Sequence, residues 1–359
     1  MLTTNKMVRE GMVAMKLSLR QQRILATIVE TYIRTGEPVG SKVLSRMLDF
    51  TASPATVRSD MAWLFDMGYL EQPHTSAGRV PSHLGYREYI DSLMTCRPLS
   101  EDEKNEINSL FNVRDPDPDK LLEDAADALS DYTGCATVTS AITPKTVRVK
   151  RVELIAAGSG TVVILIIATN GVIRNKVVRI DFKVTAELMD FFSKFANSRF
   201  AGRSIETITA DYIGSVTVTL GEYSRIFTPL LIGIYELCRE INDGQYYVSG
   251  GNKLLDYSEL SQLARDLLSL LDRRDQLQQL FNPGGGHDFK ILIGKENSSM
   301  ELSGSSVVVS HYEIGGQQAG TVGLIGPVRL DYAKIIPHLD YFAKTLGELL
   351  AETYKLDGE

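Results

Sequence analysis

The chain has 359 residues, which is too long for one ordinary domain and predicts two or three. Its 43% hydrophobic and 23% charged residues are typical of a soluble folded protein, and no apolar run is long enough to span a membrane. The net charge of −7 disfavours broad, non-specific coating of nucleic acid. The charge is uneven, however: residues 1–90 hold 11 Lys/Arg and 8 Asp/Glu (net +3), whereas the other 269 residues hold 27 and 37 (net −10). A mildly basic N-terminal part on an acidic body still permits contacts with phosphate.

The sequence predicts a cytoplasmic protein that is not an enzyme. Cys96, Cys135 and Cys238 are far apart and odd in number, which fits a reducing compartment and no zinc site. No signal-peptide pattern opens the chain, and the polar residues 1–16 are predicted to be a disordered arm. The motifs of nucleotide-binding loops, serine hydrolases, zinc proteases and kinases do not occur, so we expect no cofactor and no metal.

The first two predicted elements are helices. Residues 19–35 carry apolar side chains at helical spacing and end at Gly36, and Glu37-Pro38 forms the connection. Residues 41–48 form a second, short helix. We expect Ser41, Lys42 and Arg46 of this helix to contact phosphates.

A third helix follows and begins at a strong start signal. Ser53 is a good N-cap, and Pro54 suits the first helical position. Val57, Met61 and Leu64 make one buried stripe, which leaves Thr56, Arg58 and Ser59 free to face the major groove of DNA, next to the Ser53 cap. Two short helices joined by a tight turn make a helix-turn-helix. The alternative for the third helix taken alone is a capped amphipathic surface helix.

A β-hairpin is predicted after Gly68, with residues 69–73 as one strand and residues 74–81 as its tip and return strand. A hairpin in this position is a wing, and a plain surface hairpin is the alternative. We expect the wing to contact phosphate or the minor groove through the following small or basic side chains: His74, Thr75, Ser76 and Arg79. Residues 17–97, which end in a helix at 84–94, are therefore predicted to form a winged helix DNA-binding domain.

These segments resemble one known family. The sequences YIRTGEPVGSK (32–42), SPATVRSDM (53–61) and GYLEQPHTSAGRVP (68–81), with residues 20–25 and 85–87, are similar to the N-terminal domain of the heat-inducible transcription repressor HrcA family. The run VGLIGPVRLDY (322–332) also resembles that family. The resemblance covers nearly the whole chain except the first fifteen or so residues.

The rest of the chain predicts an α+β body. A polar link leads to Asp-Pro-Asp-Pro-Asp at 115–119, which is the best domain boundary. A helix at 120–132 and strands at 136–142, 147–156, 161–168 and 172–180 follow, and strands return at 289–293, 306–312 and 318–325 before a final helix. The resemblance implies a GAF-like domain made of residues 98–184 and 287–359, so this antiparallel α+β domain is discontinuous.

Residues 185–286 are predicted to be mostly helical and to interrupt that domain. Helices are expected at 186–200, 221–242, 257–271 and 273–281, with a short strand at 246–248 and an exit linker at 282–287. The resemblance implies an inserted dimerisation domain. The apolar stripe that we assign to dimerisation contains Leu260, Leu263, Leu267 and Leu271, and packing within its own domain is the alternative.

The resemblance also implies a function. It implies a homodimer that represses chaperone operons by binding an inverted-repeat operator in double-stranded DNA, with half-sites about 10 base pairs or a multiple apart. It further implies that chaperonin keeps the repressor active and that there is no membrane partner. An alternative from another class is a winged-helix regulator that senses a small molecule bound in its GAF-like domain. An enzyme is disfavoured because no catalytic constellation is found.

Overall fold

The structure is a computed structural model that describes residues 17–75, 77–111, 117–141, 146–158, 160–181, 183, 185–281 and 289–356. The predicted arm at 1–16, the hairpin residue Ser76 and the exit linker at 282–287 lie outside these residues. Within the described ranges, no helix is both long and apolar enough to cross a membrane.

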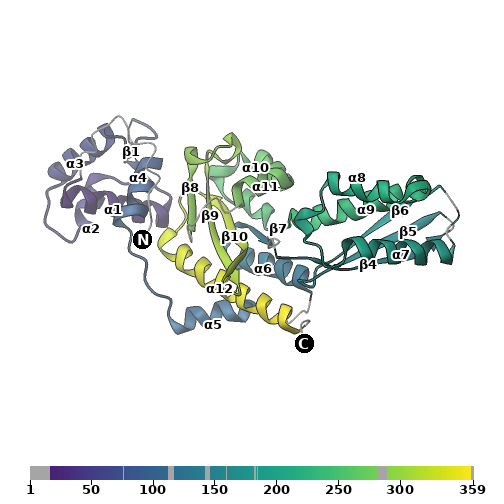
Figure 1. The fold of residues 1–359 in the computed structure, drawn as a ribbon. Coiled ribbons are helices and arrows are strands. Elements are labelled where there is room, and N and C mark those ends of the chain that lie inside the picture. The colour runs from purple at the N-terminus through teal and green to yellow at the C-terminus, as the bar shows by residue number, and fades with distance from the viewer. Residues whose placement is uncertain are drawn as a thin grey trace.

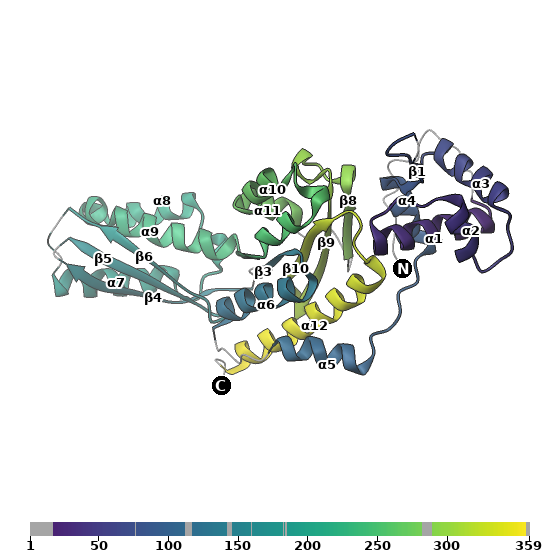
Figure 2. The same ribbon diagram turned by 180° about the vertical axis from the view of Figure 1, so that it is seen from behind.

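The molecule has three parts (Figures 1 and 2). An N-terminal unit, residues 17–94, lies at one end. The body lies in the middle and contains a five-stranded sheet. An insertion, residues 147–241, extends to the opposite end. The first part of the chain therefore forms one end of the molecule, and a segment from its middle forms the other end. The last part of the chain belongs to the body.

The N-terminal unit is built from four helices and a hairpin. Helix α1 (Leu19–Thr35) starts in a capping box between Ser18 and Gln21 and stops at Gly36, whose φ of 69° suits a helix end. Helices α2 (Ser41–Met47) and α3 (Pro54–Asp66) follow, then the hairpin strands β1 (Leu70–Glu71) and β2 (Val80–Pro81). Helix α4 (His83–Glu88) continues as one π-helical turn, η1 (Tyr89–Leu93). These elements match the predicted order, and the helix ends differ from the predicted ones by at most two residues.

The hairpin gains a third backbone partner from the segment between α1 and α2. Val39 and Arg79 exchange two backbone hydrogen bonds of 2.9 Å. Gly78 makes this pairing possible, because a Cβ atom there would lie 2.5 Å from the carbonyl oxygen of Val39. The hairpin is therefore fixed to the helices at its base.

A helical link joins this unit to the body. Helix α5 (Glu101–Leu110) has a capping box from Ser100, and its C-terminal Phe111 packs on Phe342 with ring centroids 4.5 Å apart. Helix α6 (Pro118–Thr133) begins inside the Asp-Pro tract, where Pro118 occupies the first helical turn and Asp117 caps it. The tract therefore starts a helix instead of only separating two domains.

The sheet of the body is antiparallel and draws its strands from distant parts of the chain. Its order is β7-β3-β10-β9-β8. The bounds are β3 (Ala136–Ala141), β7 (Gln245–Ser249), β8 (Phe289–Ile293), β9 (Ser305–Ile314) and β10 (Gln317–Pro327). Strand β3 is an interior strand between the edge strand β7 and the central strand β10, so the body closes only when its N-terminal and C-terminal segments meet.

Helices cover both faces of this sheet. On one face, α6 and α12 (Tyr332–Leu356) pack against it, and the hydroxyls of Thr137 and Thr139 in β3 donate to carbonyl oxygens of α6 at 2.6 and 2.8 Å. On the other face, α10 (Ala264–Leu271) and α11 (Arg274–Phe281) share a core with the sheet. Three-layer packing of this kind leaves most of β9 and β10 buried.

The insertion is a separate sheet-and-helix unit. Strands β4 (Val149–Gly158), β5 (Thr161–Ala168) and β6 (Ile173–Arg179) form a three-stranded antiparallel sheet. Helices α7 (Ala186–Phe200), α8 (Ala210–Thr219) and α9 (Ser224–Asn242) pack with it, and the buried side chains of this core all come from residues 147–241. Because these strands do not pair with the sheet of the body, the expected boundary at residue 185 is wrong.

The C-terminal boundary of the insertion also differs from the expected one. Strand β7 and helices α10 and α11 lie within the expected range of 185–286, but they pair or pack with the sheet of the body. The insertion is thus mixed α+β rather than mostly helical. Helix α8 is an unexpected element, since its sequence ADYIGSVTVT is rich in β-branched residues that favour strands.

The leucine stripe assigned to dimerisation is buried inside the chain. Leu260, Leu267 and Leu271 are at most 5% exposed, and Leu263 packs against the same core. Their contacts are with the sheet of the body, so the four leucines offer no free apolar face to a second subunit. This corrects the expectation in favour of packing within the chain.

Candidate nucleic-acid interface

The first turn of α3 is exposed to solvent and is stabilised by an N-cap. The hydroxyl of Ser53 accepts a 3.1 Å hydrogen bond from the backbone N–H of Thr56, and Pro54 is the first helical residue. Val57 is fully buried, whereas Arg58 and Ser59 are exposed. Thr56 is half-buried, and its hydroxyl lies 2.9 Å from that of Ser53. The residues predicted to face a groove therefore do lie together at one exposed helix end.

A salt bridge that the sequence analysis missed fixes the direction of α3. The guanidinium of Arg20 in α1 donates to both carboxylate oxygens of Asp60, at 2.8 and 3.1 Å. Asp60 shares the buried face with Val57 and Met61, and its side chain is 8% exposed. The hydrogen bond from Arg20, followed by the charge of Asp60, raises the pKa of the Arg20 guanidinium. An acid within an apolar stripe was the signal available, because a buried carboxylate requires a cation or donor.

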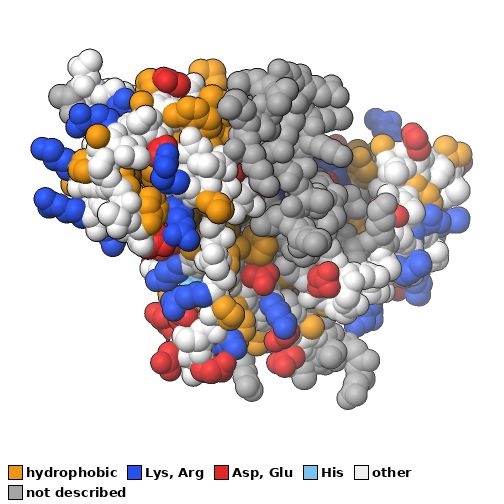
Figure 3. Space-filling view, turned by 90° about the vertical axis from the view of Figure 1, so that its left-hand side faces the viewer, with side chains coloured by type: hydrophobic (Ala, Val, Ile, Leu, Met, Phe, Trp, Pro, Cys, Tyr) orange, Lys and Arg blue, Asp and Glu red, His pale blue; other side chains and the backbone are white. Residues whose placement is uncertain are grey.

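Helix α2 places two cations beside this helix end. Lys42 and Arg46 are exposed, while Leu44 on the opposite side of α2 is fully buried and anchors the helix. Ser41 is half-buried at the start of α2. Helices α2 and α3 pack against each other, so the exposed cations of both belong to one unit. Figure 3 views the molecule from the side of the N-terminal unit, where Lys and Arg side chains project into solvent.

The cations of this unit divide into two groups. Arg20, Arg23 and Arg87 form ion pairs with Asp60, Asp49 and Glu296. Within the described part of the chain, no ion pair engages Lys42, Arg46 or Arg58, all of which are exposed. Cations without a protein carboxylate are the ones that can release counterions from a polyanion.

The hairpin contributes less surface than expected. His74 and Thr75 are exposed at its tip, but Arg79 is half-buried, and its guanidinium lies 4.6 Å from the centre of the Phe65 ring. This cation–π contact joins the hairpin to the end of α3. Arg79 therefore holds the hairpin in place. No local sequence pattern indicates this contact, because the two residues belong to different elements.

The N-terminal unit is docked on the body through Arg87. Its guanidinium donates to Glu296, with Nε 2.9 Å from Oε1, and to the carbonyl oxygen of Ile291 at 2.8 Å. Burial works to lower the pKa of Arg87, but Glu296 and Asp91 outweigh it and the pKa is raised. A second contact, Arg329 with Glu259, lies beside Gly36 at the end of α1. The exposed end of α3 lies away from both contacts.

No cluster of three or more metal-ligating side chains occurs among the residues that the structure describes. The geometry at the end of α3 instead offers hydroxyl donors, backbone N–H groups of a helix start and unpaired cations. This set suits an anionic polymer.

The fold and this exposed helix end define a multidomain α+β protein whose small helical unit presents a basic face. Comparisons with known proteins narrow this class. Residues 119–336 match the family described as "HrcA protein C terminal domain". The chain belongs to the HrcA family.

Named relatives extend over most of the chain. The "Heat-inducible transcription repressor HrcA" of Clostridium acetobutylicum is 34% identical over 330 residues, which cover 90% of this chain and 94% of that protein. The protein of the same name from Acetivibrio thermocellus is 32% identical over 338 residues, covering 93% and 96%. A solved structure described as a hypothetical protein is similar in fold, with a TM-score of 0.63 and 24% identity, covering 94% of this chain and 100% of that one.

Proposed function

We propose that the chain is a heat-inducible transcription repressor that binds an operator through its N-terminal unit, a winged helix domain. The observation that carries the proposal is the exposed first turn of α3, with Arg58 and Ser59 facing solvent and the unpaired cations Lys42 and Arg46 on helix α2, which packs against α3. Membership of the HrcA family supports the repressor role, since the relatives bear that name. In this proposal α3 enters the major groove, α2 contacts phosphates and the hairpin tip with His74 and Thr75 reaches the backbone.

The roles of the two arginines in this unit differ. Arg58 is exposed and can pair with guanine, which is worth about 1–3 kcal/mol of discrimination against a wrong base. Arg79 acts indirectly, because it stacks on Phe65 and positions the hairpin. Ser53 and Thr56 are partly occupied by the helix cap, so their contribution comes from the helix start that they stabilise.

The experiment compares an inverted-repeat chaperone operator with a scrambled duplex of the same length by fluorescence anisotropy. Arg58→Ala should weaken operator binding about 5- to 150-fold and change the scrambled duplex much less. Arg34→Ala, an exposed arginine at the far end of α1, is the matched control and should leave both affinities unchanged. Equal losses on both duplexes would reassign Arg58 to phosphate contact, and no operator preference in the wild-type protein would overturn the proposal.

The proposed repressor is a homodimer joined by the insertion. The outer face of the three-stranded sheet, opposite its helices, carries aliphatic side chains: Ile155, Val163 and Val177 are cross-strand neighbours, and Ile167 lies beside Ile173. The same face also carries polar and charged residues, namely Arg151, Glu153, Asn175 and Arg179. Ile155, Ile173 and Val177 are 52 to 62% exposed. An exposed face of aliphatic side chains on an antiparallel sheet marks an interaction surface, and a second copy can cover it with the same face about a two-fold axis.

Two valines test this surface. Val177→Glu places a charge in the centre of the proposed contact, while Val218→Glu changes a valine of α8 that is 79% exposed. The first variant should dissociate to monomers in light-scattering measurements at micromolar concentration and lose tight operator binding, because one half-site alone remains. The second should stay dimeric. A Val177→Glu protein that remains a dimer would show that the interface lies elsewhere.

Regulation by chaperonin is part of the proposal, and the resemblance to the HrcA family supports it. Operator binding measured with and without chaperonin should show a lower dissociation constant in its presence. No effect of chaperonin on a freshly refolded sample would remove this part while leaving the DNA-binding proposal in place.

A further inference from the structure

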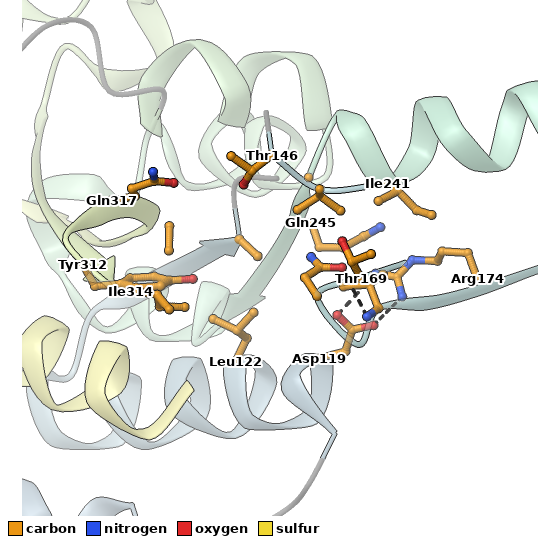
Figure 4. A pocket seen from close by; sticks show the side chains of 16 residues that line it. Asp119, Leu122, Thr146, Thr169, Arg174, Ile241, Gln245, Tyr312, Ile314 and Gln317 are labelled. Atoms are coloured by element: carbon orange, nitrogen blue, oxygen red, sulfur yellow. Dashed lines mark hydrogen bonds and ion pairs between the residues drawn. The ribbon is translucent and has the colours of Figure 1, made fainter. Parts of the chain in front are cut away.

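A cavity of about 290 Å³ lies at the junction of the body and the insertion (Figure 4). The body contributes Leu122 from α6 and Tyr312 from β9, and the insertion contributes Arg174 from β6 and Ile241 from the end of α9. Gln245, the first residue of β7, lies where the chain returns from the insertion to the body. Junctions between folded units are preferred places for small-molecule sites, and this volume is at the lower end of their usual range.

The charges on the wall of the cavity are already paired. Arg174 is 13% exposed and donates to Asp119 at 2.6 and 3.2 Å and to the carbonyl oxygen of Ile173 at 2.8 Å. Its Nε is 3.7 Å from Glu240. Asp119 and Arg174 are the charged residues of the described lining, and they neutralise each other. A ligand with a net charge would leave that charge without a partner in a partly dry site, which is costly.

The remaining wall combines apolar surface with uncharged polar groups. Leu122, Ile241 and Ile314 supply apolar contacts, while the side-chain amides of Gln245 and Gln317 supply hydrogen-bond donors and acceptors. Amide groups can satisfy both a carbonyl and an N–H of a ligand. An apolar cavity with a few polar groups is the usual composition of a small-molecule site.

We propose that this cavity is a binding site for a small uncharged molecule that has an apolar ring and amide-like hydrogen-bonding groups. A molecule there touches both the insertion and the body, so it fixes their relative position. The proposal rests on the cavity alone and does not depend on the repressor function. It differs from a ligand held within the domain of the five-stranded sheet, because six of the sixteen residues that line the cavity belong to the insertion.

The test uses three probes of the same shape and different charge: benzamide (neutral), benzoate (anionic) and benzamidine (cationic). The full-length protein, with isoleucine methyl groups labelled with carbon-13, is titrated and followed by NMR. We expect benzamide to bind with a Kd on the order of millimolar, as suits a molecule of this size. It should shift the methyl signals of Ile241 and Ile314 and leave that of Ile28, in the N-terminal unit, unchanged. The charged probes should bind at least about tenfold more weakly.

Variants locate the binding. Ala319→Leu fills the cavity from β10 and should abolish the shifts of the methyl signals. Gln317→Trp covers the cavity from an exposed position and should abolish them too, so it provides a test if Ala319→Leu fails to fold. Ala210→Leu, on the exposed start of α8, is the matched control and should bind as the wild type does. Unchanged shifts in Gln317→Trp, no saturable binding of benzamide, or tighter binding of a charged probe would each overturn the proposal.

Discussion

The docking of the N-terminal unit on the body should depend on Arg87 and Glu296. Both side chains are about three-quarters buried, at 26 and 27% exposed, and Arg87 also satisfies the carbonyl oxygen of Ile291. Removing one partner of a fully buried pair costs about 3–5 kcal/mol, whereas an exposed pair is worth about 1 kcal/mol or less. For a pair with this intermediate exposure, Arg87→Met should weaken docking by about 2 kcal/mol, which is a roughly 30-fold shift toward the undocked state.

Native-state proteolysis measures this shift. Residues 95–100 connect the two parts without regular secondary structure, and docking holds both ends of this connection in place. Undocking lets the connection take the extended shape that a protease cleaves. When opening is fast relative to cleavage, the cleavage rate follows the population of the open state, so Arg87→Met should be cut about 30-fold faster. Glu296→Gln keeps the shape of the side chain, and its cleavage rate should lie between the rates of Arg87→Met and the wild type. Arg23→Met, which breaks a pair that is 58 and 67% exposed, is the control and should change the rate little. Equal rates for Arg87→Met and Arg23→Met would refute the reasoning.

Two further predictions concern titratable groups. Burial works to raise the pKa of Glu259, but the hydrogen bond and charge of Arg329, together with hydrogen bonds from a backbone N–H and from Ser258, outweigh it and lower the pKa below 4.5. Because the folded-state pKa is lowered, the ionised carboxylate stabilises the fold above about pH 4.5, and this stabilisation is lost as the pH falls further. Glu259→Gln should therefore reduce the fall of the melting temperature with decreasing pH. An unchanged dependence on pH would contradict this prediction. Burial raises the pKa of Cys135, and that of Cys238 to about 12, whereas Cys96 is exposed. Native protein treated with iodoacetamide should therefore gain one adduct by intact mass, at Cys96, and a second adduct without denaturant would show that the cores open.

Local signals predicted the helices of the N-terminal unit well. Ser53 and Pro54 mark the start of α3, and Gly36 marks the end of α1, because caps act on the nearest backbone groups. The exposed side chains of α3 followed from the buried stripe through Val57 and Met61. These inferences need only the periodicity of one helix and are independent of distant contacts.

Contacts between distant residues could not be predicted in the same way. Alternating residues indicated the strands at 149–179, but alternation does not say which sheet a strand joins, and β3 pairs with β10 some 180 residues later. The stripe containing Leu260 and Leu267 was read correctly as apolar, yet a sequence does not show whether its partner is the same chain or another. Likewise, Arg79 looked like a free cation because Phe65 is not near it in sequence.

The position of β3 beside the central strand β10 has a consequence for the newly made chain. The insertion takes its whole core from residues 147–241, so it can close as soon as that segment leaves the ribosome. Strand β3 is made earlier but must wait for β10, which ends at Pro327, and Arg87 must wait for Glu296, 209 residues downstream. During synthesis the sheet of the body exposes unpaired edges and apolar faces after both outer parts have taken shape. The body is therefore the part of this protein that most needs protection from aggregation while the chain is completed.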